Sequence, residues 1–280
     1  MKKINLFLFG FLFLFVISCD KYEEVQKKDV PEVVPVVNDL TPEMKQRAFM
    51  SEVTSTTCGI CGGSGYSNFN LIKKNNTGKI IALAFHCNFP DDSMVCNNLL
   101  NSYDGSRPTG SGIPAFYIGD KKTTTTGMQP YVDTLLMRLP EAQVKFNAVI
   151  EGSKMNVTSK IKFFKNVTGD YYVTFFLCEH GIDGSPTAPT GYAQSGGSAG
   201  YKHNNVVRAA NTTTAYGVKI TTAATTAINT VFDYTCSINI ASNWNKAKLF
   251  VTAVIWKRNP DNTAPCQYLF INGWDTQVYN

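Results

Sequence analysis

The hydrophobic and polar positions follow two different patterns along the chain, and the pattern changes near residue 140. Before that point, apolar runs alternate with stretches in which apolar residues recur at helical spacing. The run 80–85, Ile-Ile-Ala-Leu-Ala-Phe, is typical of a strand buried on both faces. A helical crossover between the first two strands predicts that they pair in parallel, and the last two strands form a hairpin. The expected elements are strands at 48–53, 80–85, 115–118 and 123–126 and helices at 66–74, 92–103 and 128–139.

After residue 140 the helical spacing disappears, and apolar and polar positions alternate instead. This pattern predicts an all-β antiparallel sandwich of the immunoglobulin or fibronectin kind. A stretch rich in Gly, Ser and Pro, 181–202, predicts a long loop inserted between strands. The expected strands are 144–150, 155–164, 171–178, 228–240, 248–256 and 267–271, with hairpin turns at Gly169-Asp170 and 259–262.

The first 18 residues predict a secretory signal peptide. Lys2 and Lys3 precede an apolar run, 4–17, that is too short to favour a membrane-spanning helix. The sequence Val16-Ile17-Ser18-Cys19 resembles a bacterial lipobox, in which Cys19 is lipidated and becomes the mature N-terminus. The alternative is an ordinary signal peptide followed by an incidental cysteine. Lipidation would attach the chain to a membrane through its acyl groups.

The expected organisation has four parts, and the composition excludes several classes of protein. Apolar residues make up 44% and charged residues 17%, which excludes a disordered chain. The 26 basic residues are scattered, which argues against nucleic acid as a partner. Proline-rich sequence after Cys19 predicts an extended tether. The parts are the signal peptide at 1–18, the tether at 19–45, an α/β domain at 46–140 and the β-sandwich at 141–280.

A pair of cysteines carries the clearest chemical signal in the sequence. Cys58-Gly59-Ile60-Cys61 follows the strand 48–53 and precedes the helix 66–74. Two thiols at this spacing in the first turn of a helix can form a reversible disulfide, and the helix N-terminus stabilises the thiolate of the first. Cys58 would then attack a client protein and Cys61 would resolve the mixed disulfide. A zinc site needs four ligands, and the sequence has no second CxxC, so we expect no metal and no cofactor.

The remaining cysteines leave several pairings open. An odd number remains when Cys19 is set aside, so at least one is an unpaired thiol or bonds to another chain. Cys87 and Cys96 flank a polar loop and either close it with a disulfide or stay as buried thiols. The pattern does not decide which of Cys178, Cys236 and Cys266 pair, if any do.

The α/β part resembles the thioredoxin fold. The resemblance rests on the element order, on the CxxC after the first strand, and on Ile113-Pro114 before a later strand. It implies that Pro114 is a cis-proline beside the redox pair and that the backbone of Ile113 binds substrate. The chain differs from thioredoxins in having Thr57 before the first cysteine, where they have Trp, and Gly59-Ile60 between the cysteines, where they have Pro. Three glycines that follow, Gly62, Gly63 and Gly65, each weaken a helix by roughly 1 kcal/mol and could delay its start beyond the cysteines.

A wider resemblance covers most of the chain after the leader. The lipoprotein leader, the CGICG segment, the strand ending at His86 and Ile113-Pro114 are similar to a Bacteroidetes outer-membrane lipoprotein family, founded by the 28-kilodalton outer-membrane protein of Porphyromonas. The segments 177–182 and 201–210 also resemble that family, although Asn205 replaces its second histidine. The resemblance implies a lipid anchor in the outer membrane, facing the periplasm or the surface, and it supplies no reaction.

Several polar residues have both a functional and a structural interpretation. His203 and Arg208 either form a polar binding site beside the loop 181–202 or satisfy loop carbonyls. His86 either tunes Cys58 or is a hydrogen-bonded residue at a strand end. Asp91-Asp92 is expected to be a solvated turn.

Two hypotheses for the function follow. The first is a lipid-anchored scaffold or binding protein of the cell envelope, in which the Cys58–Cys61 disulfide is fixed. The second is a thiol–disulfide oxidoreductase that acts on extracytoplasmic protein clients through Cys58 and Cys61. The missing Trp and Pro favour the first hypothesis, and the position of the motif between strand and helix favours the second.

Overall fold

The structure, a computed structural model, describes residues 39–87, 92–104, 112–261 and 266–276. All of them belong to one compact unit of the chain. The expected signal peptide, Cys19 and residues 20–38 of the tether lie outside these residues. Within the described part, no helix combines the length and the apolar character that crossing a lipid bilayer requires.

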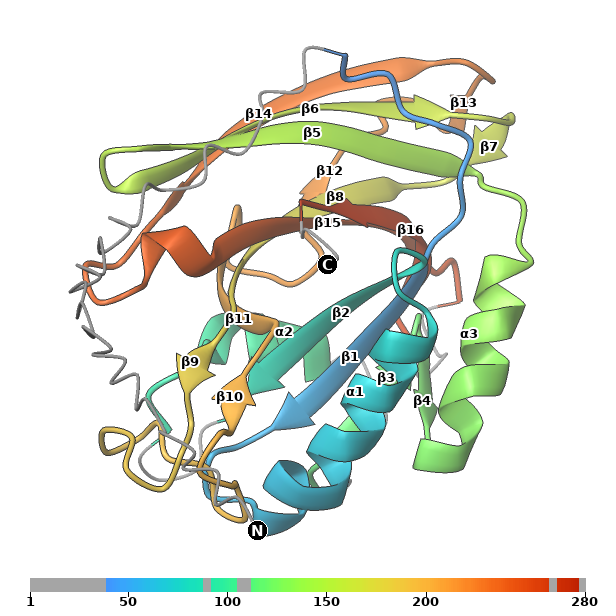
Figure 1. Cartoon of the computed structure of the whole chain (residues 1–280). Coiled ribbons are helices and arrows are strands. Elements are labelled where there is room, and N and C mark those ends of the chain that lie inside the picture. The colour runs from blue at the N-terminus through green and yellow to red at the C-terminus, as the bar shows by residue number, and fades with distance from the viewer. Residues whose placement is uncertain (1–38, 88–91, 105–111, 262–265, 277–280) are drawn as a thin grey trace, which may run out of the picture. The chain divides into compact units, whose positions relative to one another are not determined.

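The first half of the described chain alternates strands and helices as the hydrophobic pattern predicts. The first two strands pair in parallel, and the third and fourth form an antiparallel hairpin. Helices α1 and α3 lie on one face of these strands and α2 on the other (Figure 1). The elements are β1 (Ala48–Thr54), α1 (Tyr66–Asn75), β2 (Ile80–His86), α2 (Asn97–Asp104), β3 (Ala115–Ile118), β4 (Lys121–Thr123) and α3 (Met128–Leu136).

The edge strand predicted at 123–126 is shifted toward the N-terminus. Gly119 adopts a φ of 60° in a tight turn, so that Lys121 already pairs with Ile118. The strand therefore begins directly after the turn, and 125–127 form a 3₁₀ turn that leads into α3. The position of Gly119, rather than the β-branched run, sets the register of this hairpin.

Apart from a 3₁₀ turn at Lys246–Lys248, the regular structure of the second half consists of strands, as the pattern predicts. The long strands are β5 (Ala142–Glu151), β6 (Lys154–Phe163), β8 (Tyr171–Glu179), β14 (Val231–Asn239), β15 (Leu249–Arg258) and β16 (Tyr268–Asp275). The short ones are β7 (Val167–Thr168), β9 (Ile182–Asp183), β10 (Lys202–His203), β11 (Val206–Ala210), β12 (Val218–Lys219) and β13 (Thr225–Thr226).

Strands from both halves of the chain hydrogen-bond in one mixed sheet. Its order is β16-β15-β8-β11-β2-β1-β3-β4, and β12 also pairs with β8 to make nine strands. A separate three-stranded sheet, β14-β6-β5, lies over β8 and β15 (Figure 1). One layer of the expected sandwich is thus a continuation of the sheet that begins with β1. The domain boundary near residue 140 stays a prediction.

The turn at Gly169-Asp170 does not close a hairpin, contrary to expectation. The strand before it, β7, pairs with β13, and β8 after it pairs with β15, β11 and β12. Gly169 has a φ of 92°, which lets the chain pass from one layer to the other.

Two hydrophobic cores share the central strands β8 and β15. Phe176 and Trp256 belong to the core between the mixed sheet and its helices. Phe175 and Ile255, their neighbours in sequence, belong to the core under the three-stranded sheet. Because successive side chains of a strand point to opposite faces, these two strands contribute to both cores at once.

The short strand β11 joins the two halves. Its Val206 pairs in parallel with Ala84 of β2, and the Ala84 N–H donates to the carbonyl of Asn205 at 2.8 Å. The Asn205 side chain donates to the Ala82 carbonyl at 3.0 Å and accepts from Lys73 Nζ at 2.6 Å. Asn205 has a φ of 61°, a left-handed conformation that asparagine tolerates better than most residues.

Trp256 tests whether the two halves unfold together. It is fully buried and contacts the rings of Phe49 and Tyr103 from the first half. It also contacts the ring of Tyr216, which lies between β11 and β12. We expect Trp256→Ala to lower the free energy of unfolding by about 3–5 kcal/mol in a single transition, measured by urea denaturation with circular dichroism. Trp256→Phe should cost less, since the indole Nε1 has no hydrogen-bond partner among the described residues. Two separate transitions in either variant would contradict this expectation.

Candidate functional site

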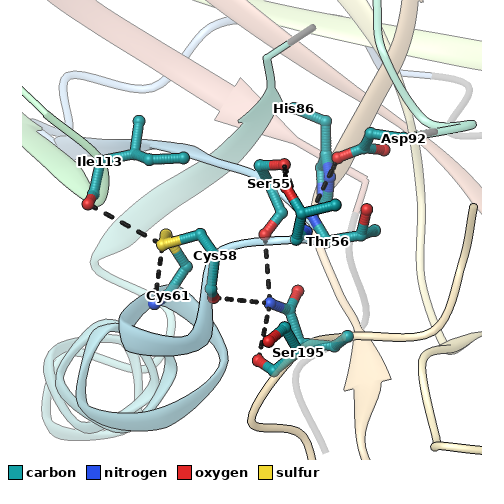
Figure 2. The surroundings of a disulfide bond; sticks show 10 residues. Ser55, Thr56, Cys58, Cys61, His86, Asp92, Ile113 and Ser195 are labelled. Carbon is teal, nitrogen blue, oxygen red and sulfur yellow. Dashed lines mark hydrogen bonds and ion pairs between the residues drawn. A yellow bond between two sulfur atoms is a disulfide. The ribbon is translucent and has the colours of Figure 1, made fainter. Parts of the chain in front are cut away.

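Cys58 and Cys61 form a disulfide where the chain passes from β1 into a helix (Figure 2). Helical structure begins at Gly59, and Cys61–Gly65 form a turn of π-helix that continues into α1. The Cys61 N–H lies 3.1 Å from Cys58 Sγ and donates to it. The glycines therefore do not delay the start of the helix, and the cysteines lie at its N-terminus rather than in a loop.

The two sulfurs differ in their access to solvent. Cys58 is half-buried, whereas Cys61 is 1% exposed. Between them, Ile60 is 66% exposed and leaves an apolar side chain next to the disulfide. Cys58 is therefore the more accessible residue of the pair.

The structure places Ile113 and Pro114 against the redox turn, residues 55–62. The Ile113–Pro114 peptide is cis, and the Ile113 carbonyl lies 3.8 Å from Cys58 Sγ. Pro114 packs on the first turn of the helix at Gly65, where a Cβ would lie 3.0 Å from the proline Cγ. Both residues that the sequence placed beside the cysteines are thus there.

A loop from the second half of the chain packs on the redox turn as well. Within the loop 184–200, the Gln194 side-chain amide donates to the carbonyls of Ser55 and Cys58 at 3.1 and 3.0 Å. The Ser195 N–H donates to the Thr56 carbonyl at 2.6 Å. The sulfur of Cys58 points toward Ile113, while its carbonyl faces the loop that carries Ser195 (Figure 2).

Asp92 anchors the start of the redox turn. Its carboxylate accepts from His86 Nδ1 at 2.8 Å and from the N–H groups of Thr56 and Met94 at 2.9 Å each (Figure 2). Burial raises the pKa of Asp92, but the hydrogen bond and charge of His86, together with the N–H groups of Thr56 and Met94, outweigh it and hold the pKa below its usual value. Of the solvated turn predicted at Asp91-Asp92, Asp91 lies outside the described residues. At Asp92 the prediction was wrong, because its side chain is fully buried. His86 reaches the redox turn through Asp92 and is a hydrogen-bonded residue at the strand end.

A polar cavity lies between β1, α1 and the β9–β10 hairpin. Glu52, Tyr66, His86, Tyr201 and His203 line it, together with smaller groups. Its volume of about 10 Å³ is close to that needed by one water molecule. Among the described residues, Glu52 Oε2 has no hydrogen-bond partner.

Burial keeps the acid and one histidine of this cavity neutral. Desolvation raises the pKa of Glu52 to about 8 and lowers the pKa of His203 to about 4. His203 Nε2 donates to the Tyr192 carbonyl at 2.8 Å, so this histidine satisfies a loop carbonyl, as one of its two interpretations expected. At neutral pH neither Glu52 nor His203 carries a charge.

Arg208 is held by contacts with two neighbouring side chains. Its side chain forms a buried ion pair with Glu179, with Nε and Oε2 3.5 Å apart, and stacks over Trp244 at 5.0 Å. Through these two contacts Arg208 connects β11 with β8 and with the loop before β15. The binding interpretation of Arg208 finds no support in these contacts.

The remaining cysteines form no disulfide among themselves in the described structure. The bond between Cys87 and Cys96 is not formed, and burial raises the pKa of the Cys96 thiol. Cys178 is a buried thiol, burial raises the pKa of Cys236 to about 11, and Cys266 Sγ donates to the Asp120 carbonyl at 2.7 Å. Among the described residues, no three His, Cys, Asp or Glu side chains are grouped to hold a metal ion.

Sequence reasoning missed Glu52 and Gln194. A carboxylate inside the otherwise apolar strand segment Ala-Phe-Met-Ser-Glu-Val is a signal that could have singled out Glu52. No local pattern marks Gln194, because its role depends on a contact across 136 residues of sequence.

Comparison with known proteins shows a likeness of fold only. No protein-family model and no curated protein matches the chain. Among solved structures, HBP35 of Porphyromonas gingivalis is similar, with a TM-score of 0.62 and 14% identity over 84% of this chain and 76% of that one. The E. coli curli protein CsgC aligns with a TM-score of only 0.20 and 10% identity, over 48% of this chain and 97% of that one. The first likeness extends across both halves and associates this fold with a Porphyromonas protein.

The pKa of Glu52 predicts a specific pH dependence of stability. In the unfolded chain the pKa of this carboxyl has its usual value of 4.5, whereas burial in the fold raises the pKa to about 8. The protonated fold is therefore favoured at low pH, and stability is lost as pH rises through this window. We expect Glu52→Gln to remove this loss, which makes the variant more stable than the wild type by about 3–5 kcal/mol at pH 9.

Urea unfolding of both proteins at pH 4, 6, 8 and 9 tests this expectation. At pH 4 the wild-type carboxyl is mostly protonated in both states, so that point serves as the internal control. A difference between the two proteins that does not grow with pH would contradict a buried, neutral Glu52.

Proposed function

We propose that the chain is a thiol–disulfide exchange protein with a thioredoxin-like arrangement around Cys58 and Cys61, attached to the cell envelope by a lipid at Cys19. The observation that carries the exchange function is the unequal exposure of the two cysteines: Cys58 is half-buried and Cys61 is 1% exposed. An exchange protein needs one sulfur that clients can reach and a second that only the first can reach.

The proposed reaction proceeds by two sulfur displacements. The Cys58 thiolate attacks a client disulfide, which forms a mixed disulfide and releases one client sulfur as a thiolate that takes up a proton. Cys61, after losing its proton, then attacks Cys58 Sγ and releases the second client thiol. Two electrons pass from the protein dithiol to the client, and the protein is left with the Cys58–Cys61 disulfide. The same steps in reverse oxidise a client dithiol.

Local geometry supports Cys58 as the nucleophile. The Cys61 N–H aims at Cys58 Sγ at 3.1 Å, and the helix that begins at Gly59 adds its positive end. Both favour the thiolate over the thiol and lower the pKa of a cysteine in that position. The open side of Cys58 is bordered by the exposed Ile60 and by Ile113, so a client with an extended apolar segment fits this surface.

The thioredoxin-like interpretation rests on the contacts around the motif. The order β1-α1-β2, then β3-β4-α3, places the CxxC at the end of β1 and Pro114 against the same helix turn. The similarity to HBP35 of Porphyromonas gingivalis supports a place for the chain near the Bacteroidetes lipoprotein family that its motifs resemble. We infer from this an outer-membrane location with protein clients as partners.

A scaffold or binding protein is the second candidate. Thr57 and Gly59-Ile60 replace the Trp and Pro that thioredoxins carry, and no basic side chain lies within the motif. In that case Cys58–Cys61 is a fixed bond, and the surface beside it binds a partner without exchange.

The reduction potential of Cys58–Cys61 and turnover with insulin separate the two candidates. We expect the detergent-solubilised protein to reduce insulin in the presence of dithiothreitol, and Cys58→Ser to abolish this activity. Cys61→Ser should accumulate mixed disulfides with envelope proteins, since the resolving thiol is missing. A potential below about −300 mV without turnover would instead mark a fixed structural bond.

The lipid anchor has its own test. We expect Cys19→Ser to move the protein from the membrane fraction to the soluble fraction and to abolish labelling with a radioactive fatty acid. Cys236→Ser, which changes a cysteine of β14, is the matched control and should stay with the membranes. Unchanged sedimentation of Cys19→Ser would refute the anchor without affecting the redox proposal.

A further inference from the structure

The loop 184–200 holds the redox turn by its backbone. Two neighbouring residues of the loop, Gln194 and Ser195, donate hydrogen bonds to the carbonyls of Ser55, Thr56 and Cys58. Gln194 is 4% exposed although it lies in a Gly- and Ser-rich segment. The backbone immediately before and at the reactive cysteine is therefore fixed by a segment more than a hundred residues away.

The loop 184–200 also packs closely against Gly62, at the helical end of the redox turn. A Cβ added at Gly62 would lie 2.4 Å from the Ser195 carbonyl oxygen, a distance that real side chains do not adopt. Gly63, the next residue, has open space at the same position. Gly62 thus permits a close backbone approach that any other residue would prevent.

We propose that Gln194 is a positioning residue, through which the loop 184–200 stabilises the disulfide form of Cys58 and Cys61 relative to the dithiol. The pair concerned is that of the proposed function, but the inference is about its equilibrium and not about client turnover. The loop keeps the Cys58 backbone in place, with its Cα 5.2 Å from that of Cys61. Without the loop, the dithiol form gains conformational freedom that must be lost again when the bond closes.

Equilibration with glutathione measures this effect directly. The protein disulfide accepts two electrons and two protons from two glutathione thiols, which become one glutathione disulfide, and the S–S bond of Cys58–Cys61 breaks. Gln194→Ala removes the hydrogen bonds to Ser55 and Cys58, and one hydrogen bond corresponds to a factor of about five. We therefore expect this variant to shift the equilibrium toward the dithiol by at least about fivefold. Gln129→Ala, which removes a hydrogen-bonded amide from α3, should change it less than twofold.

A pair of glycine variants tests the same contact without altering Gln194. Gly62→Ala and Gly63→Ala introduce the same methyl group on the same helical turn, and only the first collides with Ser195. Gly62→Ala should shift the glutathione equilibrium in the direction of Gln194→Ala, and Gly63→Ala should leave it within twofold of the wild type. A structural role alone would lower the urea midpoint of unfolding and leave the glutathione equilibrium unchanged, which would overturn the proposal.

Reciprocity gives an independent readout in the wild-type protein. If the loop stabilises the disulfide, the disulfide stabilises the loop contact by the same factor. The Ser195 N–H, which donates to the Thr56 carbonyl, should then exchange with deuterium about fivefold faster after reduction. A factor of about five corresponds to the loss of one hydrogen bond. Equal exchange in both redox states would overturn the proposal. An inactive wild type with a shifted Gln194→Ala equilibrium would refute the proposed exchange function and leave this inference standing.

Discussion

The pairing of β11 with β2 is the constraint on which the rest of the structure depends. β2 already pairs with β1 on its other edge, so β11 extends the α/β strands into the β-rich half through the Val206–Ala84 bridge. Asn205 secures that bridge through its left-handed backbone and its bond to the Ala82 carbonyl. Because the loop 184–200 ends just before this point, the same pairing brings Gln194 and Ser195 to the redox turn. One contact between distant segments thus contributes both to the mixed sheet and to the position of the loop at the redox turn.

Much of the local structure could be predicted from the sequence, because it depends on neighbouring residues. The apolar run 80–85 and the alternation in 155–164 determine strands whatever they pack against. The position of Ile113-Pro114 beside the cysteines followed from a resemblance in element order. The sequence did not determine that β8 and β15 lie in the same sheet as β1, since alternation shows which faces are buried and not which strand lies alongside.

The glycines after the motif show why local reasoning gave the wrong expectation at the site. Helix propensity treats Gly62 and Gly65 as weak positions, and in isolation they would be. In the fold they let two other segments approach the helix closely, with Pro114 against Gly65 and the Ser195 carbonyl against Gly62. Packing from both sides offsets the poor propensity, and the helix begins at Gly59. Asp92 was misjudged for a similar reason, because its partners His86 and Thr56 come from two different strand ends.

The size of the disulfide ring bears on whether the bond serves stability or exchange. In the chain-entropy picture, a bond between residues three apart restricts the unfolded chain by about 2 kcal/mol, against about 5 kcal/mol for a loop of a hundred residues. Cys178 and Cys236, which are separated by a far longer stretch, remain thiols in the fold. The chain therefore forms its described disulfide where the stabilisation is smallest and where one sulfur is accessible. This position fits the proposed reversible exchange better than a purely stabilising role.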